Sequence, residues 1–347
     1  MKKILLTLLW VILIPIVLFG VFLIYSTLFE YTPADQEIVF NTEESAALPE
    51  STSFTAMTWN FGFTGLGANM DFFYDGGEKV RDSKENVSKN LGSITRYVAQ
   101  YDTVDFLLLQ EVDLKSKRSY YTNHLEALGE VLPEHQAFLG LNYVVDFVPI
   151  PVKEPFGKIK SGLVTYSKYL PRSSVRHSYH GNYKWPMSTF MLKRCYLVNR
   201  YPLSDGREFL LINLHNSAYD DGSLRAAQLE QLSAFVEGEY NKGNYVFIGG
   251  DWNQCPTDFI PRMEHVFDTV TLSYLPADFL KGWEQVYSDT IPTNRRIMIP
   301  YDQSKTPTTL IDFYIVSPNI EIESVWTEDL SFENTDHNPV FITFRLK

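Results

Sequence analysis

The segment YVFIGGDWN, residues 245–253, joins a short apolar run to two polar side chains. Its first four residues, Tyr245–Ile248, have the length and bulk of a buried strand. The two glycines that follow let the backbone turn tightly and leave room for a ligand. Asp251 and Asn253 stand two residues apart, so both can point to the same side of an extended segment. Asp251 can then orient or deprotonate a water molecule and Asn253 can hold a phosphate oxygen, with an ordinary Asx turn as the alternative.

Further apolar runs of strand length occur on both sides of this segment. They are Phe54–Trp59, Asp105–Leu109, Gly162–Tyr166, Phe209–Leu214, Ile311–Val316 and Val340–Phe344. Helices are predicted at Lys84–Gln100 and Leu224–Tyr240, where apolar residues recur on one face. Because no repeat, low-complexity tract or long linker interrupts this series, we expect one α+β domain over residues 54–347, with two packed sheets flanked by helices.

Most of these strands begin or end with a carboxylate, a histidine or an asparagine. Besides Asp251 and Asn253, the polar residues concerned are Asn60, Glu111, His215, Asp312, Asp336 and His337. Polar groups at the ends of neighbouring strands meet at one rim of a sheet, which is how a rigid scaffold assembles a site from distant parts of a sequence. The sequence therefore predicts that these side chains form one site.

Taken alone, each of these residues also has a structural explanation. Glu111 follows a buried strand and suits a hard cation such as Mg²⁺, but a solvated acid at a strand end explains it as well. Asp312 lies inside an apolar strand and needs a partner, because an unpaired buried charge is costly. His337 is the candidate partner, and a carboxylate that keeps it protonated lets it stabilise charge on a phosphorane. His215 suits protonation of a leaving oxygen or contact with phosphate, and a structural histidine is the alternative.

The overall composition is that of a folded acidic protein. Of 347 residues, 45% are hydrophobic, and the net charge is −12, so the chain can bury a large core and repels polyanions at long range. This charge weakens a nucleic-acid interpretation but leaves room for a nuclease, because a bound metal and a few basic residues dominate at contact distance. The two cysteines, Cys195 and Cys255, are too few for a disulfide framework, and we expect both to be buried.

The N-terminal stretch has the composition of a membrane segment. Two lysines precede an uncharged run from Ile4 to Phe29, which is longer than the roughly 20 residues that a helix needs to cross a bilayer core. A cleaved signal peptide has a shorter apolar region, and a buried core helix has a polar face that this run lacks. The lysines before the run and the acids after it place the N-terminus in the cytoplasm. We expect a transmembrane helix over residues 1–29, a spacer over residues 30–53 and an extracytoplasmic domain after it.

Taken in order, short segments of the chain resemble the endonuclease/exonuclease/phosphatase superfamily, whose members include DNase I-like nucleases and neutral sphingomyelinases. The segments are Thr58-Trp59-Asn60, Gln110-Glu111, Ser161-Gly162-Leu163, Leu214-His215, Gly250-Asp251-Trp252-Asn253, Ile311-Asp312-Phe313 and Asp336-His337-Asn338-Pro339. The resemblance spans residues 54–347. It implies a four-layer αββα sandwich that hydrolyses a phosphoester by in-line attack of water, with Mg²⁺, or alternatively Mn²⁺, as cofactor.

The resemblance also implies a metal site. Glu111 is similar to the family's main metal ligand, with Asn60 and Asp336 near the metal. Trp252 departs from the family pattern, in which a smaller or aliphatic residue is common at this position, and we expect it to narrow the pocket.

The remaining candidates resemble residues that act on water and phosphate. Asp251 is similar to the residue that positions or deprotonates the attacking water, and Asn253 and His215 are similar to phosphate contacts. Asp312 resembles the partner that orients His337.

Two further segments bear on the substrate. Phe61–Arg81 is rich in glycine and aromatic residues and is predicted either as an aromatic loop over the site or as a loop packed on the body. Apolar residues 147–151, with lysines after them, are predicted at the rim, and solvated lysines are the alternative. The anchor, the acidic body and the aromatic loop favour cleavage of a phospholipid headgroup or a small phosphoester. An extracytoplasmic DNase I-like nuclease is the first alternative, and a catalytically inactive surface binding domain is the second.

Overall fold

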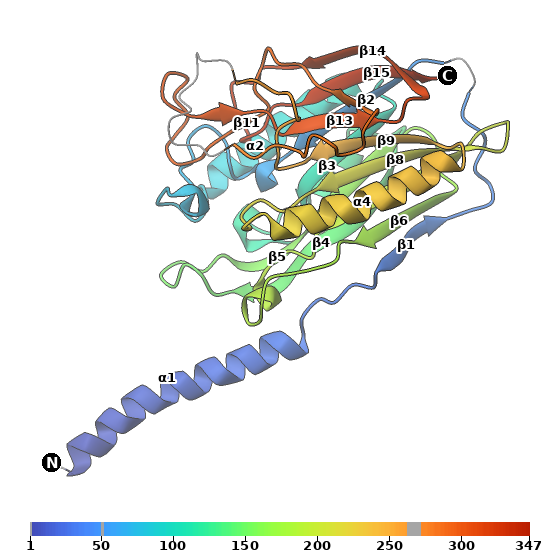
Figure 1. The fold of residues 1–347 in the computed structure, drawn as a ribbon. Helices are drawn as coiled ribbons and strands as arrows, with labels where there is room; N and C mark the ends of the chain where they lie inside the picture. Colours follow the sequence, from blue (N-terminus) through green and yellow to red (C-terminus); the bar gives the residue numbers. More distant parts are fainter. Residues whose placement is uncertain (1, 50–51, 262–271) are drawn as a thin grey trace.

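The computed structural model describes residues 2–49, 52–261 and 272–347, and most of the strands in these ranges belong to two large β-sheets (Figure 1). In spatial order, the seven-stranded sheet comprises β1 (Gln36–Asn41), β6 (Ser173–Ser178), β7 (Cys195–Pro202), β8 (Glu208–His215), β9 (Tyr245–Asp251), β13 (Asp312–Val316) and β10 (Glu284–Val286). The six-stranded sheet comprises β14 (Ile320–Thr327), β15 (Val340–Leu346), β2 (Phe54–Asn60), β3 (Phe106–Asp113), β5 (Gly157–Ser167) and β4 (Gln136–Val148). A small two-stranded sheet is formed by β11 (Asn294–Arg295) and β12 (Thr308–Thr309).

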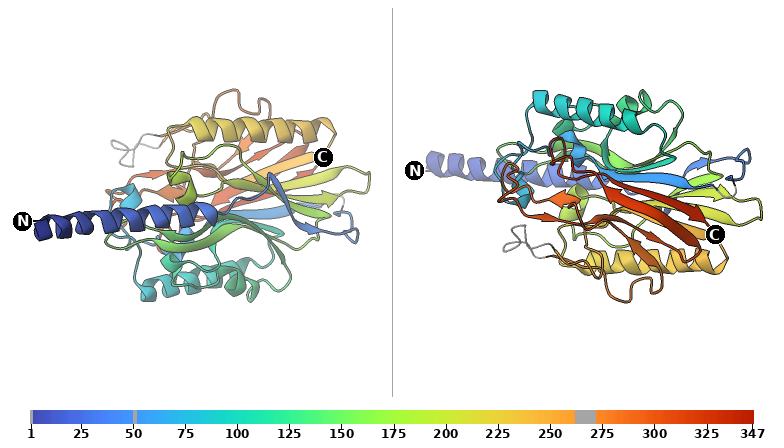
Figure 2. Two further views of the ribbon diagram at one scale, coloured as in Figure 1. Left: turned by 90° about the horizontal axis from the view of Figure 1, so that it is seen from below. Right: turned by 90° about the horizontal axis from the view of Figure 1, so that it is seen from above.

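Helices cover the outer faces of the two sheets, so the domain has four layers (Figure 2). The α-helices are α1 (Lys2–Leu28), α2 (Lys84–Val98), α3 (His124–Gly129) and α4 (Ser223–Asn241). Short 3₁₀ turns are η1 (Gly62–Thr64), η2 (Phe73–Asp75), η3 (Ala99–Tyr101), η4 (Lys117–Ser119) and η5 (Met187–Phe190). One apolar cluster lies between α4 and the seven-stranded sheet, and another lies between the six-stranded sheet and the pair α2 and α3. The predicted αββα sandwich is confirmed.

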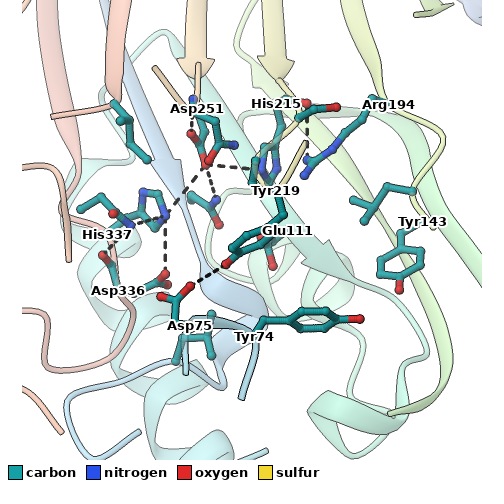
Figure 3. Close-up of a pocket in the computed structure, with 18 of the residues that line it drawn as sticks. Tyr74, Asp75, Glu111, Tyr143, Arg194, His215, Tyr219, Asp251, Asp336 and His337 are labelled. Atoms are coloured by element: carbon teal, nitrogen blue, oxygen red, sulfur yellow. Dashed lines mark hydrogen bonds and ion pairs between the residues drawn. The ribbon is translucent and has the colours of Figure 1, made fainter. Parts of the chain in front are cut away.

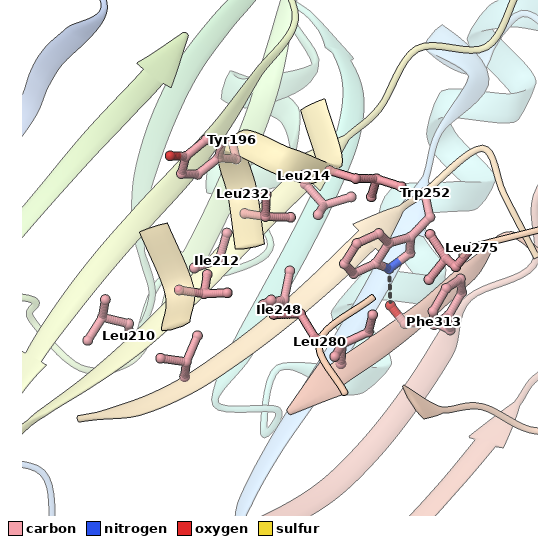
Figure 4. Packing of buried hydrophobic residues seen from close by; sticks show 14 of the residues in the cluster. Tyr196, Leu210, Ile212, Leu214, Leu232, Ile248, Trp252, Leu275, Leu280 and Phe313 are labelled. Carbon is pink, nitrogen blue, oxygen red and sulfur yellow. Dashed lines mark hydrogen bonds between the residues drawn. The ribbon is translucent and has the colours of Figure 1, made fainter. Parts of the chain in front are cut away.

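The alternation of side chains along β8 shows how one strand serves two cores. Phe209 and Leu211 point into the cluster between the two sheets. Leu210, Ile212 and Leu214 point the other way, where they pack beneath α4 (Figure 4). Because successive side chains in a strand face opposite sides, a strand buried on both faces is apolar throughout, as this run is.

All the strands and both helices predicted from apolar patterns are present, with ends that differ by a few residues. The strands that the pattern did not reveal include β4, β6, β7 and β14. In β14, only the two end residues are buried and the others are exposed or half-buried. A strand whose stabilisation comes from pairing with neighbours rather than from its own apolar run gives a weak local signal.

The N-terminal part differs from the prediction in one respect. No residue of α1 is buried, and its length and hydropathy suit a membrane span. Residues 30–53, expected to be a spacer, contain β1, which pairs antiparallel with β6 at the edge of the seven-stranded sheet. Val39 and Phe40 pack against a buried cluster that includes Phe138 and Leu197. This apolar contact ties the segment to the domain, so the sheet begins inside the predicted spacer.

Candidate active site

A cavity of about 280 Å³ lies at the edge where β2, β3, β8 and β9 end and where β13 and β15 begin. Most of the site residues predicted from the sequence line it, and several of them are labelled in Figure 3. They are Asn60, Glu111, His215, Asp251, Asn253, Asp336 and His337. Asp312 stands behind His337 and is fully buried. The structure therefore brings all the predicted site residues together.

Asp251 lies at the centre of this group because of strand register. β9 pairs with β8 on one side and with β13 on the other, which sets Asp251 opposite His215 and Asp312. Its Oδ2 accepts a hydrogen bond from Asn60 Nδ2 at 2.9 Å and lies 3.4 Å from His215 Nε2. Burial, followed by the carboxylate of Asp312, raises the pKa of Asp251 to about 7. A carboxylate with such a pKa is suited to accept a proton from water near neutral pH.

His337 is held between carboxylates. Its Nδ1 lies 2.8 Å from Asp312 Oδ2, and its Nε2 lies 3.6 Å from Asp336 Oδ2 and 3.9 Å from Asp251 Oδ2. Burial by itself lowers the pKa of a histidine, but these carboxylates outweigh it and raise the pKa of His337 to about 10. The ring is therefore positively charged at neutral pH and can stabilise negative charge that develops on a phosphate.

His215 has the opposite electrostatic environment. Burial, followed by the positive charge of Arg194, lowers the pKa of His215 well below 6.5, so the ring is neutral. Its Nδ1 is buried and has no hydrogen-bond partner within the part of the chain that the structure describes. A neutral ring is a poor proton donor to a leaving oxygen, so this environment favours the phosphate-contact role over the general-acid role.

Glu111 and Asp336 face the same cavity from the end of β3 and from the loop before β15 (Figure 3). Burial raises the pKa of Asp336 to about 6, and the negative charge of Glu111 contributes to the rise. Two carboxylates that repel each other, in a cavity that Asn60 also lines, provide oxygen ligands of the kind that Mg²⁺ and Mn²⁺ prefer. These three residues therefore fit a divalent metal.

The backbone at two of the candidate residues is strained. Glu111 and Asn253 have φ angles of 56° and 53°, which are uncommon for residues other than glycine. Such conformations cost free energy and cluster at functional sites, where the surrounding structure maintains them. At Asn253, the main-chain N–H donates to Asp251 Oδ1 at 2.9 Å and the side-chain amide donates to the Asn216 carbonyl at 2.9 Å. The strained turn therefore holds the Asp251 carboxylate in place.

A second cluster has ligand atoms close enough to hold an ion but is less suited to one. Potential ligand atoms of Asp251, Asp312 and His337 all lie within 4.8 Å of one another. However, a protonated imidazole has no free lone pair to offer a metal. This cluster is therefore better suited to charge stabilisation and proton transfer than to holding a metal ion.

Two residues beside the histidines were not predicted. Arg194 lines the cavity, and its Nη1 lies 3.5 Å from the His215 carbonyl oxygen. The side-chain nitrogen of Asn294 in β11 lies 3.0 Å from His337 Nε2. Neither residue belongs to a recognisable sequence motif. The one local signal is that Arg194 directly precedes the apolar start of β7.

The loop Phe61–Arg81 combines the two predicted alternatives. Phe63 and Phe72 are buried in an apolar cluster, so the loop is packed on the body. Tyr74 nevertheless reaches the cavity, where it stacks on Tyr219 with ring centroids 5.9 Å apart. The hydroxyl of Tyr219 donates to Asp75 Oδ1 at 2.8 Å, which fixes this aromatic pair at the rim (Figure 3).

The expectation that Trp252 narrows the pocket is wrong. Trp252 is fully buried in the apolar cluster on the α4 side of the seven-stranded sheet, stacks on Phe313, and donates its indole N–H to the Phe313 carbonyl at 3.0 Å (Figure 4). In a strand, adjacent side chains point to opposite faces, so the residue after Asp251 enters the core. Gly250, which was expected to leave room for a ligand, has a different role. Its φ is 146°, and a Cβ at this position would lie 2.1 Å from the Leu214 carbonyl oxygen. The absence of a side chain at Gly250 therefore allows β8 and β9 to pair closely.

A two-sheet sandwich flanked by helices, with carboxylates and histidines at one rim, defines a DNase I-like class of hydrolase fold. Comparison with known families matches residues 57–337 to the Endonuclease/Exonuclease/phosphatase family. Because the match covers most of the chain, the protein belongs to this family. A search of curated proteins found no match.

Solved structures with the same fold come from bacteria and animals. An endonuclease/exonuclease/phosphatase from Beutenbergia cavernae has a TM-score of 0.58 and 16% identity, covering 85% of this chain and 72% of that one. ANGEL2, described as a 2′,3′-cyclic phosphatase, has a TM-score of 0.54 and 14% identity, covering 84% and 95%. D. rerio TDP2 complexed with a single-strand DNA product has a TM-score of 0.52 and 14% identity, covering 85% and 100%. At these identities the likeness establishes the fold alone.

Proposed function

We propose that this chain is a divalent-metal-dependent phosphoesterase, tethered to a membrane by α1, whose domain outside the cell cleaves a phospholipid headgroup or a small phosphoester. The observation that carries the chemistry is the charged His337–Asp312 pair beside Asp251, in the same cavity as Glu111 and Asp336. An acceptor for a proton, a fixed positive charge and an oxygen-rich metal site are the groups that hydrolysis of a phosphoester requires.

Each of the site residues has a separate role in the proposed reaction. Asp251 positions a water molecule and accepts its proton as the water oxygen bonds to phosphorus and the bond to the leaving oxygen breaks in line. His337 offers its positive charge to the phosphate oxygens, and Asp312 holds the ring in place at 2.8 Å. When bound at Glu111 and Asp336, a divalent metal supplies neutralisation of the phosphate oxygens and of the developing charge.

The N-terminal helix supports the tether. α1 is 27 residues long, which exceeds the roughly 20 residues needed to cross a bilayer core, and none of its residues is buried. Lysines before the helix and acids after it favour an extracytoplasmic domain. A site at a membrane surface meets lipid headgroups more readily than chromosomal DNA, and the net charge of −12 works against polyanion binding.

The chemistry can be tested on the full-length chain in detergent with bis(4-nitrophenyl) phosphate. We expect turnover with Mg²⁺ and none with chelator. Glu111→Ala and His337→Ala should each lower kcat/KM at least a hundredfold, whereas Glu130→Ala, an exposed acid at the end of α3, should match the wild type. Unchanged turnover in both site variants overturns the assignment, and inactivity of the wild type on every phosphoester favours the inactive binding domain.

The substrate class needs a panel assayed with Mg²⁺ and with chelator. It comprises sphingomyelin, phosphatidylinositol-type lipids, inositol phosphates, and single- and double-stranded DNA and RNA. A nuclease is the second candidate because the stacked pair Tyr74 and Tyr219 at the cavity can also receive a base. Preference for nucleic acid by tenfold or more over every lipid would favour this second candidate.

The tether has its own test. The full-length chain should float with vesicles of phosphatidylcholine and resist extraction at alkaline pH, because about 20 apolar residues insert almost irreversibly. For orientation, Glu237→Cys introduces an exposed thiol in α4, while Cys195 and Cys255 are buried. Labelling of this thiol by a membrane-impermeant maleimide in intact cells indicates an external domain, and labelling only after lysis contradicts it.

A further inference from the structure

Large apolar side chains are exposed at the tips of two neighbouring loops. Phe147, Ile150 and Val152 stand at the end of the β4–β5 hairpin, with 42%, 37% and 86% of their surface exposed. Trp185 and Met187 stand on the β6–β7 loop, with 61% and 46% exposed. We call these five residues the loop-tip surface. Clustered exposed side chains of this size mark a surface that meets a protein or a membrane.

The loop-tip surface is continuous with the C-terminal half of α1. The ring of Phe147 lies edge-on to the ring of Phe22 with centroids 6.0 Å apart, and the Trp185 indole N–H donates to Thr27 Oγ1 at 3.1 Å. Phe22 also stacks on Phe190 at 5.6 Å. In Figures 1 and 2, α1 extends away from the domain on the side on which these loops lie.

The position of Phe22 in α1 sets the depth of this surface. A bilayer core needs about 20 apolar residues of helix. Any window of that length between Ile4 and Phe29 contains Phe22. Phe147, which contacts Phe22, must then lie at the level of the bilayer as well. This depth follows from the proposed insertion of α1 in a membrane.

We propose that the loop-tip surface rests in the interfacial layer of the same membrane that α1 enters, so that the catalytic cavity receives its substrate from that membrane. Tryptophan favours this layer because its ring is apolar and its N–H is polar. Lys153 and Lys184 are exposed beside the apolar tips. Such lysines are attracted to anionic headgroups.

The same two elements form part of the cavity wall. Tyr143 and Phe156 come from the β4–β5 hairpin, and Tyr183, Met191 and Leu192 come from the β6–β7 loop. The two elements that carry the loop-tip surface therefore also supply apolar and aromatic side chains to the cavity that holds the catalytic carboxylates. The substrate that fits this arrangement is an amphiphilic phosphoester whose headgroup enters the cavity while its acyl chains remain in the bilayer.

Contact with the membrane can be measured without any activity. The full-length chain, carrying Val152→Cys labelled with an environment-sensitive fluorophore, is reconstituted in vesicles of four parts phosphatidylcholine to one part phosphatidylglycerol. The buried Cys195 and Cys255 leave the new thiol as the exposed target. The control is Glu237→Cys, near the C-terminal end of α4, whereas residues at the N-terminal end of this helix line the cavity. Nitroxide-labelled lipid should quench the label at residue 152 at least threefold more strongly than the label at residue 237. Equal quenching overturns the proposal.

A second measurement separates surface contact from catalysis. Combined Val152→Ser and Trp185→Ser should lower turnover of vesicle-borne phospholipid at least tenfold and leave turnover of bis(4-nitrophenyl) phosphate unchanged. If both substrates are cleaved by the variant as by the wild type, the surface does not guide substrate and the proposal fails. If the wild type cleaves neither while the quenching persists, the proposed function fails and the membrane contact stands. A stable dimer in detergent that protects residue 152 from labelling would assign the surface to a second copy instead.

Discussion

Replacing Asp312 by asparagine removes one negative charge from behind His337 with little change in side-chain volume. The pKa of His337 is raised from 6.5 to about 10, three and a half pKa units, which at about 1.4 kcal/mol each favours the charged ring by roughly 5 kcal/mol. Asp312 is the largest of the carboxylate contributions and the closest, at 2.8 Å. If it supplies only a third of this free energy, its loss lowers the pKa of His337 by about one unit.

Two kinetic consequences follow for Asp312→Asn. The ring loses both its charge partner and its orientation, so kcat/KM should fall about 10²- to 10⁴-fold. The alkaline limb of the pH–rate profile should also move toward neutral pH by about one unit or more, because the protonated ring is lost as pH rises through a lower pKa. The assay is hydrolysis of bis(4-nitrophenyl) phosphate from pH 6 to pH 10 at fixed Mg²⁺, so that the metal affects both proteins alike.

A control and a double variant make this prediction refutable. Asp205→Asn makes the same chemical change at an exposed turn between β7 and β8, and it should behave as the wild type. If Asp312 acts through His337, the double variant Asp312→Asn/His337→Ala should be no slower than His337→Ala alone. Additive losses, or a single variant with the wild-type profile, would show that the pair does not act as a unit.

Three further predictions concern stability. Burial lowers the pKa of His177 to about 4. Between pH 6.5 and 4 this histidine is therefore protonated in the unfolded chain but not in the folded chain. As the pH falls through this range, the free energy of unfolding of the wild type should decrease by about 1.4 kcal/mol per pH unit more than that of His177→Gln, as measured by denaturant titration at each pH. Equal pH slopes would contradict this assignment. Trp252→Ala should lower the free energy of unfolding by about 3–5 kcal/mol in the same measurement, because it leaves a cavity in the core. A decrease of less than about 1 kcal/mol would place the ring outside the core. Mg²⁺ at a hundred times its Kd should stabilise the wild type against thermal unfolding by about 2.7 kcal/mol, and chelator should reverse this stabilisation. Mg²⁺ should stabilise Glu111→Gln much less, and equal stabilisation of the two proteins would locate the metal elsewhere.

The apolar pattern of the sequence was enough to predict most core strands and both long helices of the domain, because a buried strand or helix face is made of apolar residues. The run Phe209–Leu214 is apolar at every position since both faces of β8 are covered, and such a run is visible without any knowledge of its neighbours. β1 was hidden for the opposite reason. Its short run Ile38–Phe40 is ordinary in isolation and becomes a strand only because β6 offers an edge and an apolar cluster receives Val39 and Phe40.

The candidate site likewise depends partly on local sequence and partly on tertiary contacts. The sequence by itself determined that Glu111, His215 and Asp251 stand where strands end, which is a local property of the chain. Only the tertiary structure decided that β8 and β13 flank β9, and hence that Asp251 faces both His215 and Asp312. It also decided the charge states, because the pKa of a buried group depends on neighbours that are distant in sequence. For the same reason Arg194 and Asn294 became visible only when the strands were paired. Local patterns encode which residues are buried, whereas function depends on which residues meet.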